Sequence, residues 1–190
     1  MEIVWDLAGA LLRYPDERYL EALEVCRRGV RAVAPEAGTQ LDRLHGVLAG
    51  LSPEARQELF VATFDLNPAC ALEVGWHLFG ENYERGAFLV KMRQLLTRVG
   101  VSDGGELPDH LGTVLRVLGR MPPDEAAEFA DACLLPALAK MRTHLAGKSN
   151  PFESLLEAIA RLVTAMHGES GGNGARGAAD VPADNGRGVQ

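Results

Sequence analysis

Two carboxylates and an imidazole lie within five positions of one another, at Glu106, Asp109 and His110. Carboxylates accept hydrogen bonds and attract cations, and a carboxylate beside an imidazole can also move protons. A turn-forming run, Ser-Asp-Gly-Gly at 102–105, comes before them, and apolar residues with the spacing of one helix face follow at 111–118. We therefore expect the three side chains to be displayed together at the start of a helix, beside a loop.

Pro108 marks the expected start of this helix, because proline lacks an amide hydrogen and has a fixed φ that suits the first helical turn. Asp109 would then lie at the positive end of the helix dipole, where a carboxylate is stabilised. Acidic residues at a helix start are also ordinary caps, and a histidine there can simply be solvated. Capping alone and ligand binding are therefore the two interpretations of this stretch.

The remaining sequence gives little support for catalysis. The phosphate-binding pattern GxxxxGK[ST] does not occur, the histidines never form HExxH, and the cysteines never form CxxC. We therefore predict a protein that is not an enzyme and has no metal site and no cofactor. A small hydrolase or nucleotide-binding protein that uses Asp109 and His110 as an acid–base pair is the alternative from another class.

Charge and composition narrow the class of protein further. The net charge of −7 argues against a nucleic-acid binder and is compatible with a partner that carries positive charge. Three isolated cysteines are typical of reduced thiols in the cytoplasm. The first residues lack the basic start of a secretory signal, and no apolar run is long enough to span a membrane. We therefore expect a cytoplasmic protein without stable membrane insertion.

Apolar residues at helical spacing recur through most of the chain, and no segment alternates as a strand would. The run Ser-Pro-Glu at 52–54 is a typical helix start, and Pro136 should kink or split a later helix. We expect about nine or ten helices that form one compact all-α domain over residues 1–167. From Gly168 to Gln190 the apolar pattern ends and glycine, alanine, aspartate and asparagine dominate, which predicts a disordered tail.

A helical domain with an acidic cluster can also bind a short amphipathic peptide. Carboxylates would hold its arginines, because the guanidinium fork matches a carboxylate, and aromatic residues would hold its apolar side chains. The aromatic candidates are Phe60, Phe64, Trp76 and Phe79. Each of them could equally be a core residue.

Several stretches of the sequence resemble the NarJ branch of the TorD/DmsD/NarJ family. They are Phe-Val-Ala-Thr-Phe-Asp at 60–65, Gly-Glu-Asn-Tyr-Glu-Arg-Gly at 80–86 and Gly-Glu-Leu-Pro-Asp-His-Leu at 105–111. Leu-Leu-Arg-Tyr-Pro-Asp at 11–16 is similar to the start of the family's sequences. Members are the delta subunits, or molybdenum cofactor assembly chaperones, of respiratory nitrate reductase.

The resemblance implies an all-helical fold and a chaperone that is not an enzyme. Such a chaperone binds the N-terminal segment of the nitrate reductase catalytic (alpha) subunit. It holds that subunit in the cytoplasm for molybdenum cofactor insertion, before membrane attachment or export. It would act as a monomer or a dimer. The alternative within the family is a chaperone of another molybdoenzyme, such as a dimethyl sulfoxide, selenate or chlorate reductase or a hydrocarbon dehydrogenase.

The resemblance also implies a set of client-peptide-binding residues. Glu106, Asp109 and His110 match the family's acidic-histidine element, and Phe60 and Phe64 fall on its Tyr-x-x-Leu-Phe element. The chain has phenylalanine where the family commonly has the tyrosine, and threonine at position 63 where it commonly has the leucine. These departures remove a hydroxyl and an apolar contact from the aromatic half of the expected site.

Overall fold

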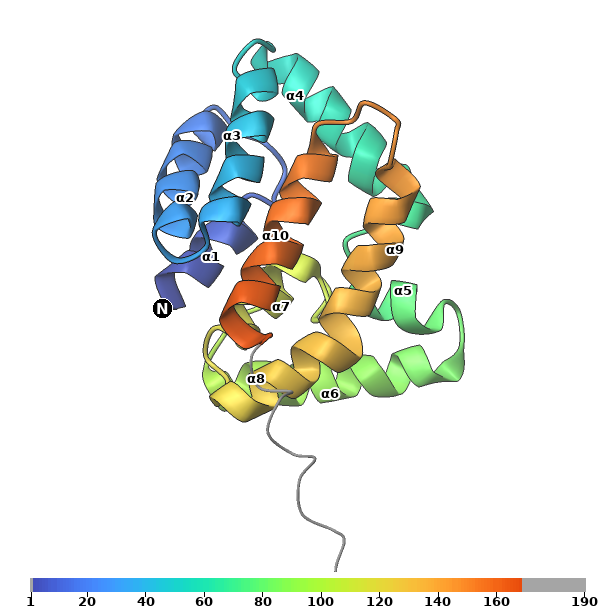
Figure 1. The fold of residues 1–190 in the computed structure, drawn as a ribbon. Coiled ribbons are helices and arrows are strands. Elements are labelled where there is room, and N and C mark those ends of the chain that lie inside the picture. The colour runs from blue at the N-terminus through green and yellow to red at the C-terminus, as the bar shows by residue number, and fades with distance from the viewer. Residues whose placement is uncertain (1, 169–190) are drawn as a thin grey trace, which may run out of the picture.

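A computed structural model describes residues 2–168, and these residues form an all-α protein (Figure 1). Among them no β-strand occurs, and one isolated antiparallel bridge joins Glu73 and His110. No helix in this part of the chain is long and apolar enough to cross a membrane. The expected fold class is therefore confirmed, while the predicted tail, apart from Gly168, lies outside the described residues.

The described residues form ten α-helices. In chain order they are α1 (Glu2–Ala10), α2 (Tyr19–Val33), α3 (Pro35–Leu48), α4 (Pro53–Phe60), α5 (Val74–Phe79), α6 (Tyr83–Val99), α7 (Leu111–Leu118), α8 (Pro123–Phe129), α9 (Leu135–Leu145) and α10 (Phe152–His167). Two π-helical turns, η1 (Val61–Asp65) and η3 (Ala130–Leu134), follow α4 and α8, and a short 3-10 turn, η2 (Pro68–Cys70), precedes α5. Helix α10 packs against both α3 and α9 (Figure 1).

Local signals in the sequence account for several helix ends. The Ser52 hydroxyl accepts a hydrogen bond from the Ala55 amide at 3.2 Å, and Pro53 occupies the first turn of α4, as expected. Helix α6 ends at Val99 and is capped by Gly100, whose φ of 68° is accessible to glycine at little cost. The interruption expected near Pro136 is confirmed, since the π-turn η3 separates α8 from α9 and Pro136 lies in the first turn of α9.

Helices α1 and α7 pack backbone to backbone because glycines face each other at their contact. A Cβ atom added to Gly9 would lie 2.6 Å from the Gly112 carbonyl oxygen, and one added to Gly112 would lie 2.8 Å from the Gly9 carbonyl oxygen. Just after the end of α7, a Cβ on Gly119 would lie 2.4 Å from the Trp5 ring. This close packing fixes the start of α7, and with it His110, against α1.

The apolar stripe of α7 lies in the core, and Leu115 is fully buried. Helix α6 is less deeply placed, because it buries Phe88, Met92 and Leu96 and leaves Leu95 only half-buried. Leu95 and Leu115, both on stripes that the sequence assigns to the core, therefore differ in how much apolar surface they remove from water.

Candidate functional site

Helix α7 begins at Leu111 and not at Pro108, so the expected helix start is three residues too early. The cause is the antiparallel bridge: the Val74 amide donates to the Asp109 carbonyl at 2.9 Å, and the Leu111 amide donates to the Leu72 carbonyl at 2.7 Å. These bonds pair residues 109–111 with residues 72–74, and a turn closed by the His110 amide on the Leu107 carbonyl at 2.9 Å precedes the bridge, so α7 begins only after His110. His110 then caps the helix, since its Nδ1 accepts a hydrogen bond from the Gly112 amide at 3.2 Å.

Asp109 is not displayed at the mouth of α7, and this part of the sequence expectation is wrong. Its side chain is 0% exposed and points toward another helix, where its Oδ2 accepts a hydrogen bond from the Gly75 amide at 3.0 Å in the first turn of α5. Its other oxygen, Oδ1, has no hydrogen-bond partner among the described residues. Asp109 therefore caps α5 and ties that helix to the segment before α7.

Glu106 and His110 do share a surface feature. They line a cleft of about 520 Å³ between α1 and the loop that leads into α7. His110 is only 7% exposed, whereas Glu106 is exposed. Other polar and aromatic residues of the lining are Asp6, Arg13, Tyr14, Asp103 and Arg116. We refer to this feature as the α1–α7 cleft.

Three carboxylates, those of Asp65, Glu106 and Asp109, and one guanidinium, that of Arg13, act on His110, so negative charge predominates around it. Burial raises the pKa of the Asp65 carboxyl, and the nearby Glu106 raises it further. Burial also raises the pKa of Glu73, and the neighbouring Asp109 adds to that rise. The pKa of Asp109 is itself raised by burial, although Gly75 and the positive charge of Arg85 oppose the shift.

Within residues 2–168, Asp65, Glu73, Glu106 and Asp109 form no ion pair, although the same part of the chain pairs many of its other carboxylates. Asp6, which also lines the cleft, is paired with Arg120 at 2.7 Å. The unpaired carboxylates give this region a negative field that favours a cationic ligand.

The chemistry of an acid–base pair is not assembled here. The Asp109 carboxylate accepts a hydrogen bond from α5, and the Nδ1 atom of His110 accepts one from α7. The two neighbouring side chains therefore cap different helices. Burial lowers the pKa of His110, and the charges of Glu106 and Asp109 only partly oppose this shift. The imidazole therefore favours its neutral form, in which it caps a helix without carrying charge into the cleft.

Phe60 and Phe64 lie in the core and do not line the cleft. Both are 3% exposed, and their rings pack against each other at a centroid distance of 5.0 Å and against Phe152 at 5.6 and 5.1 Å. The exposed member of this aromatic group is Tyr14, whose ring meets Phe60 edge-on at 6.3 Å and is itself 56% exposed. Sequence reasoning did not assign a role to Tyr14, although it lies in the 11–16 stretch that resembles the family's start.

The other aromatic candidates also have structural roles. The Trp76 indole donates to the Pro68 carbonyl at 2.8 Å, and Arg85 stacks over its ring at 5.5 Å. Phe79 packs against Phe88 at a centroid distance of 5.5 Å. Neither Trp76 nor Phe79 lines the α1–α7 cleft.

The described residues hold no group of three or more histidine, cysteine, aspartate or glutamate side chains arranged to bind a metal ion. The three cysteines are free thiols. Burial raises the pKa of Cys26 to about 12, and burial also raises the pKa of Cys70 and Cys133. Such thiols carry little thiolate at neutral pH, so they are weak nucleophiles and weak metal ligands.

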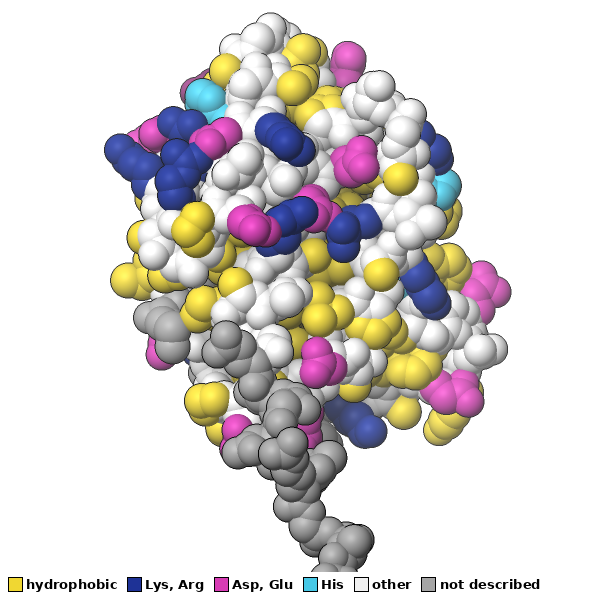
Figure 2. Space-filling view, viewed as in Figure 1, with side chains coloured by type: hydrophobic (Ala, Val, Ile, Leu, Met, Phe, Trp, Pro, Cys, Tyr) yellow, Lys and Arg dark blue, Asp and Glu magenta, His cyan; other side chains and the backbone are white. Residues whose placement is uncertain are grey.

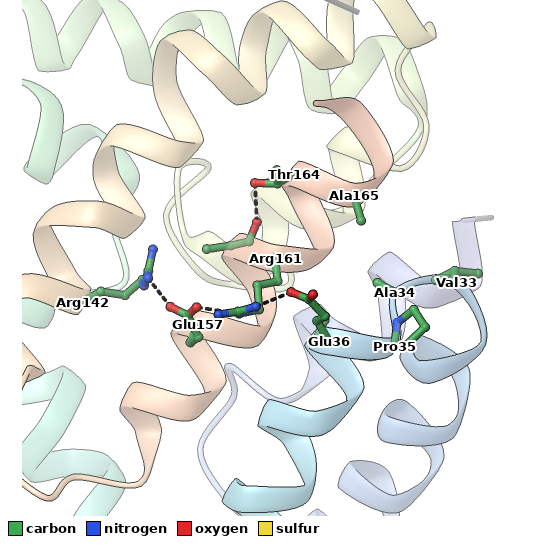
Figure 3. Close-up of a pocket in the computed structure, with 11 residues that line it drawn as sticks. Val33, Ala34, Pro35, Glu36, Arg142, Glu157, Arg161, Thr164 and Ala165 are labelled. Carbon is green, nitrogen blue, oxygen red and sulfur yellow. Dashed lines mark hydrogen bonds and ion pairs between the residues drawn. The ribbon is translucent and has the colours of Figure 1, made fainter. Parts of the chain in front are cut away.

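A second hollow, of about 470 Å³, lies between the α2–α3 junction and α10 (Figure 3). Its charged residues pair with one another: Arg161 binds Glu157 at 2.6 Å, and further pairs join Arg161 to Glu36 and Arg142 to Glu157. On this face of the molecule basic and acidic side chains lie next to each other (Figure 2). Because these charges already satisfy one another, this hollow offers a ligand less electrostatic attraction than the α1–α7 cleft.

Comparison with known proteins finds one matching family model and several relatives. Residues 31–152 match the family model described as nitrate reductase delta subunit. The nitrate reductase molybdenum cofactor assembly chaperone NarJ of Escherichia coli K12 is 26% identical over 164 residues, which cover 82% of this chain and 67% of that protein. The nitrate reductase-like protein NarX of Mycobacterium tuberculosis H37Rv is 25% identical over 161 residues. That match covers 84% of this chain and only 24% of the NarX protein.

Proposed function

The chain belongs to the nitrate reductase delta subunit family, and from this premise we propose that it is a molybdenum cofactor assembly chaperone without catalytic activity. It binds the N-terminal segment of the catalytic (alpha) subunit of a respiratory nitrate reductase. It holds that subunit in the cytoplasm while the molybdenum cofactor is inserted, before membrane attachment or export. The relationship to the E. coli chaperone supports this assignment.

The observation that carries the proposal is the set of carboxylates beside the α1–α7 cleft that form no ion pair within residues 2–168. A carboxylate that lacks a cationic partner in the free protein can gain a charge-assisted hydrogen bond when a basic peptide binds. Glu106 and Asp103 are exposed carboxylates in the lining of the cleft, and Asp65 and Glu73 add to the negative field around Glu106. A peptide with arginine or lysine residues is the ligand that this charge distribution favours.

The residues expected to bind the client then divide into two roles. Glu106 contacts a basic side chain of the client, and His110 forms part of the cleft surface beneath it. Asp109 acts as a positioning residue, because its carboxylate holds α5 against the segment that carries Glu106 and His110. Phe60 and Phe64 support the cleft from the core through the ring of Tyr14.

The test is a calorimetric titration of the pure protein with three peptides. The first copies the N-terminal segment of the nitrate reductase alpha subunit, the second is the same peptide with its basic residues changed to glutamine, and the third copies the corresponding segment of a dimethyl sulfoxide reductase. We expect saturable one-to-one binding of the first peptide and much weaker binding of the other two.

Tighter binding of the third peptide than of the first would indicate that the client is another molybdoenzyme and not nitrate reductase. The absence of saturable binding to any of the three would overturn the proposed function. Equal binding of the first and second peptides would show that the carboxylates are not the recognition element.

A further inference from the structure

A smaller hollow lies next to the α1–α7 cleft, on the opposite side of Arg13 and Tyr14. It has a volume of about 400 Å³ and lies over α1 and α2. Ala10, Arg13 and Tyr14 line both features, so these three residues form a common wall. A single extended or helical segment that passes over this wall can therefore contact both. We refer to the smaller feature as the α1–α2 hollow.

The α1–α2 hollow offers mainly apolar surface to a ligand. Leu7, Ala10 and Ala22 contribute small or aliphatic side chains, and Val25 is 39% exposed. Three of the charged residues at its edge are engaged, since Arg18 pairs with Glu21 at 3.2 Å and the Asp16 carboxylate accepts from the Arg18 amide at 2.9 Å. Arg13, which the hollow shares with the cleft, forms no ion pair among residues 2–168. The hollow therefore differs from the cleft, where Glu106 has no cationic partner in the described part of the chain.

Tyr14 lies where the two features meet, and its environment suits it to binding. Its ring is held edge-on against Phe60 at 6.3 Å, so its orientation is restricted before a ligand arrives, while 56% of the residue is exposed. A preorganised, exposed aromatic ring gains buried area on binding at a low cost in side-chain entropy. Tyrosine is accordingly enriched among the residues that dominate binding energy.

We propose that the α1–α2 hollow, together with Tyr14, binds the apolar side chains of the same client segment whose basic residues meet Glu106. This inference rests on the proposed function and adds the second half of the binding surface. The occupant is an amphipathic segment that carries basic residues next to aliphatic or aromatic ones. Carboxylates that form no ion pair within residues 2–168 and an apolar hollow lie side by side on the chaperone and would match the two kinds of side chain. Phe60 and Phe64 cannot supply this apolar contact directly, since both are buried.

The test combines receptor variants with peptide variants in calorimetric titrations. The receptor variants are Tyr14→Ala, Val25→Glu and, as a matched control, Val90→Glu on α6, where Val90 is 51% exposed and lines neither feature. The peptides are the alpha-subunit segment and a version whose apolar residues are changed to serine. Thermal melts of every variant report whether the fold is retained.

We expect Tyr14→Ala and Val25→Glu each to weaken binding of the natural segment by about tenfold or more, with Val90→Glu unchanged. Against the serine-substituted peptide the same two variants should lose little further affinity, because the contact is already absent. If Tyr14→Ala does not fold, Val25→Glu still gives the answer, since it adds a charge at a partly exposed position.

The inference is overturned on its own if the parent protein binds the segment, Glu106→Gln weakens that binding, and both Tyr14→Ala and Val25→Glu bind like the parent. It is also overturned if the serine-substituted peptide binds as tightly as the natural one. Failure of the parent protein to bind the natural segment would overturn the proposed function as well, so the two failures are distinguishable.

Discussion

The Asp109 carboxylate accepts a hydrogen bond at 3.0 Å from the amide of Gly75, which lies 34 positions earlier in the chain. Beside this bond, the antiparallel bridge between Glu73 and His110 pairs the same two segments through their backbones. The start of α5 and the approach to α7 thus form one unit held by side-chain and backbone hydrogen bonds. Glu106 lies at the exposed end of this unit, and its position depends on a buried residue that the client need not touch.

The first prediction separates the acceptor atom of Asp109 from its charge. Asp109→Ala removes the partner of the buried Gly75 amide and should lower the free energy of unfolding by ~1–3 kcal/mol. Asp109→Asn keeps an acceptor oxygen and removes only the charge. Burial raises the pKa of the Asp109 carboxyl and so already disfavours that charge, and the stability of the variant should therefore stay close to that of the parent. Chemical denaturation of both variants measures the difference. Equal destabilisation by the two changes would contradict the capping role and point to the charge itself.

The second prediction concerns pH and Glu73, whose pKa burial raises above the ordinary value of 4.5. The folded state then binds this proton more tightly than the unfolded state, so stability falls as pH rises from 4.5 through the folded pKa. Glu73→Gln cannot titrate. The unfolding free energy of the variant minus that of the parent should therefore increase from mildly acidic to neutral pH, in paired urea titrations. A difference that stays constant with pH would show that the carboxyl is not desolvated in the folded protein.

The third prediction tests the glycine contact that positions α7 on α1. Gly9→Ala places a Cβ atom 2.6 Å from the Gly112 carbonyl oxygen, so the helices must separate. We expect a loss of ~1–3 kcal/mol in the free energy of unfolding, as for other overpacked sites. The control is Gly46→Ala in α3, where an added Cβ meets no atom within 4 Å. That change should stabilise the protein by up to about 1 kcal/mol, because alanine favours the helix. Effects of the same sign and size would contradict the contact.

The fourth prediction compares two leucines that the sequence places on apolar stripes. Leu115→Ala should cost ~2–5 kcal/mol, because the side chain is fully buried and leaves a cavity. Leu95→Ala should cost clearly less, since Leu95 is only half-buried on α6. Thermal or urea unfolding of the two variants gives the comparison. A larger loss for Leu95 would mean that α6 presents a different face to the core.

The helices follow from the sequence because their signals are local. Ser52 and Pro53 mark a start and Gly100 marks an end through contacts within one turn, and the structure has the helix ends where these residues place them. The fold class and the split near Pro136 depend on signals of the same kind. Helical periodicity likewise predicts that Leu115 is buried, although it does not reveal how deeply a helix such as α6 lies in the core.

The candidate site is less predictable because its geometry depends on distant segments. Because of the bridge between Glu73 and His110, α7 begins later than predicted and the Asp109 side chain points inward. No sequence pattern near Asp109 predicts that bridge. Helical periodicity does not distinguish a groove residue from a core residue, so it could not show that Phe60 is buried. It also could not show that the exposed ring of this aromatic group is that of Tyr14. Tyr14 could have been found from its place before Pro15, which favours a connection between helices, where side chains are often exposed.

The last prediction concerns Glu106, an exposed carboxylate in the lining of the α1–α7 cleft. Glu106→Gln keeps the size of the side chain and removes its charge, so the thermal melt should not change. Loss of one charge-assisted hydrogen bond is worth ~1.5–3 kcal/mol, which corresponds to roughly ten- to a hundredfold weaker binding of the alpha-subunit peptide.

The control for Glu106 is Glu128→Gln on α8, which makes the same change of charge at an exposed position outside the cleft. Added salt screens exposed charges, so the difference between the parent and Glu106→Gln should shrink as ionic strength rises. The Glu128 variant should follow the parent at every salt concentration. If both variants lose affinity equally, the overall negative charge of the protein attracts the peptide and Glu106 makes no specific contact. If Glu106→Gln instead melts early and binds weakly, its carboxylate supports the loop before α7, and client recognition must be assigned to other residues of the cleft.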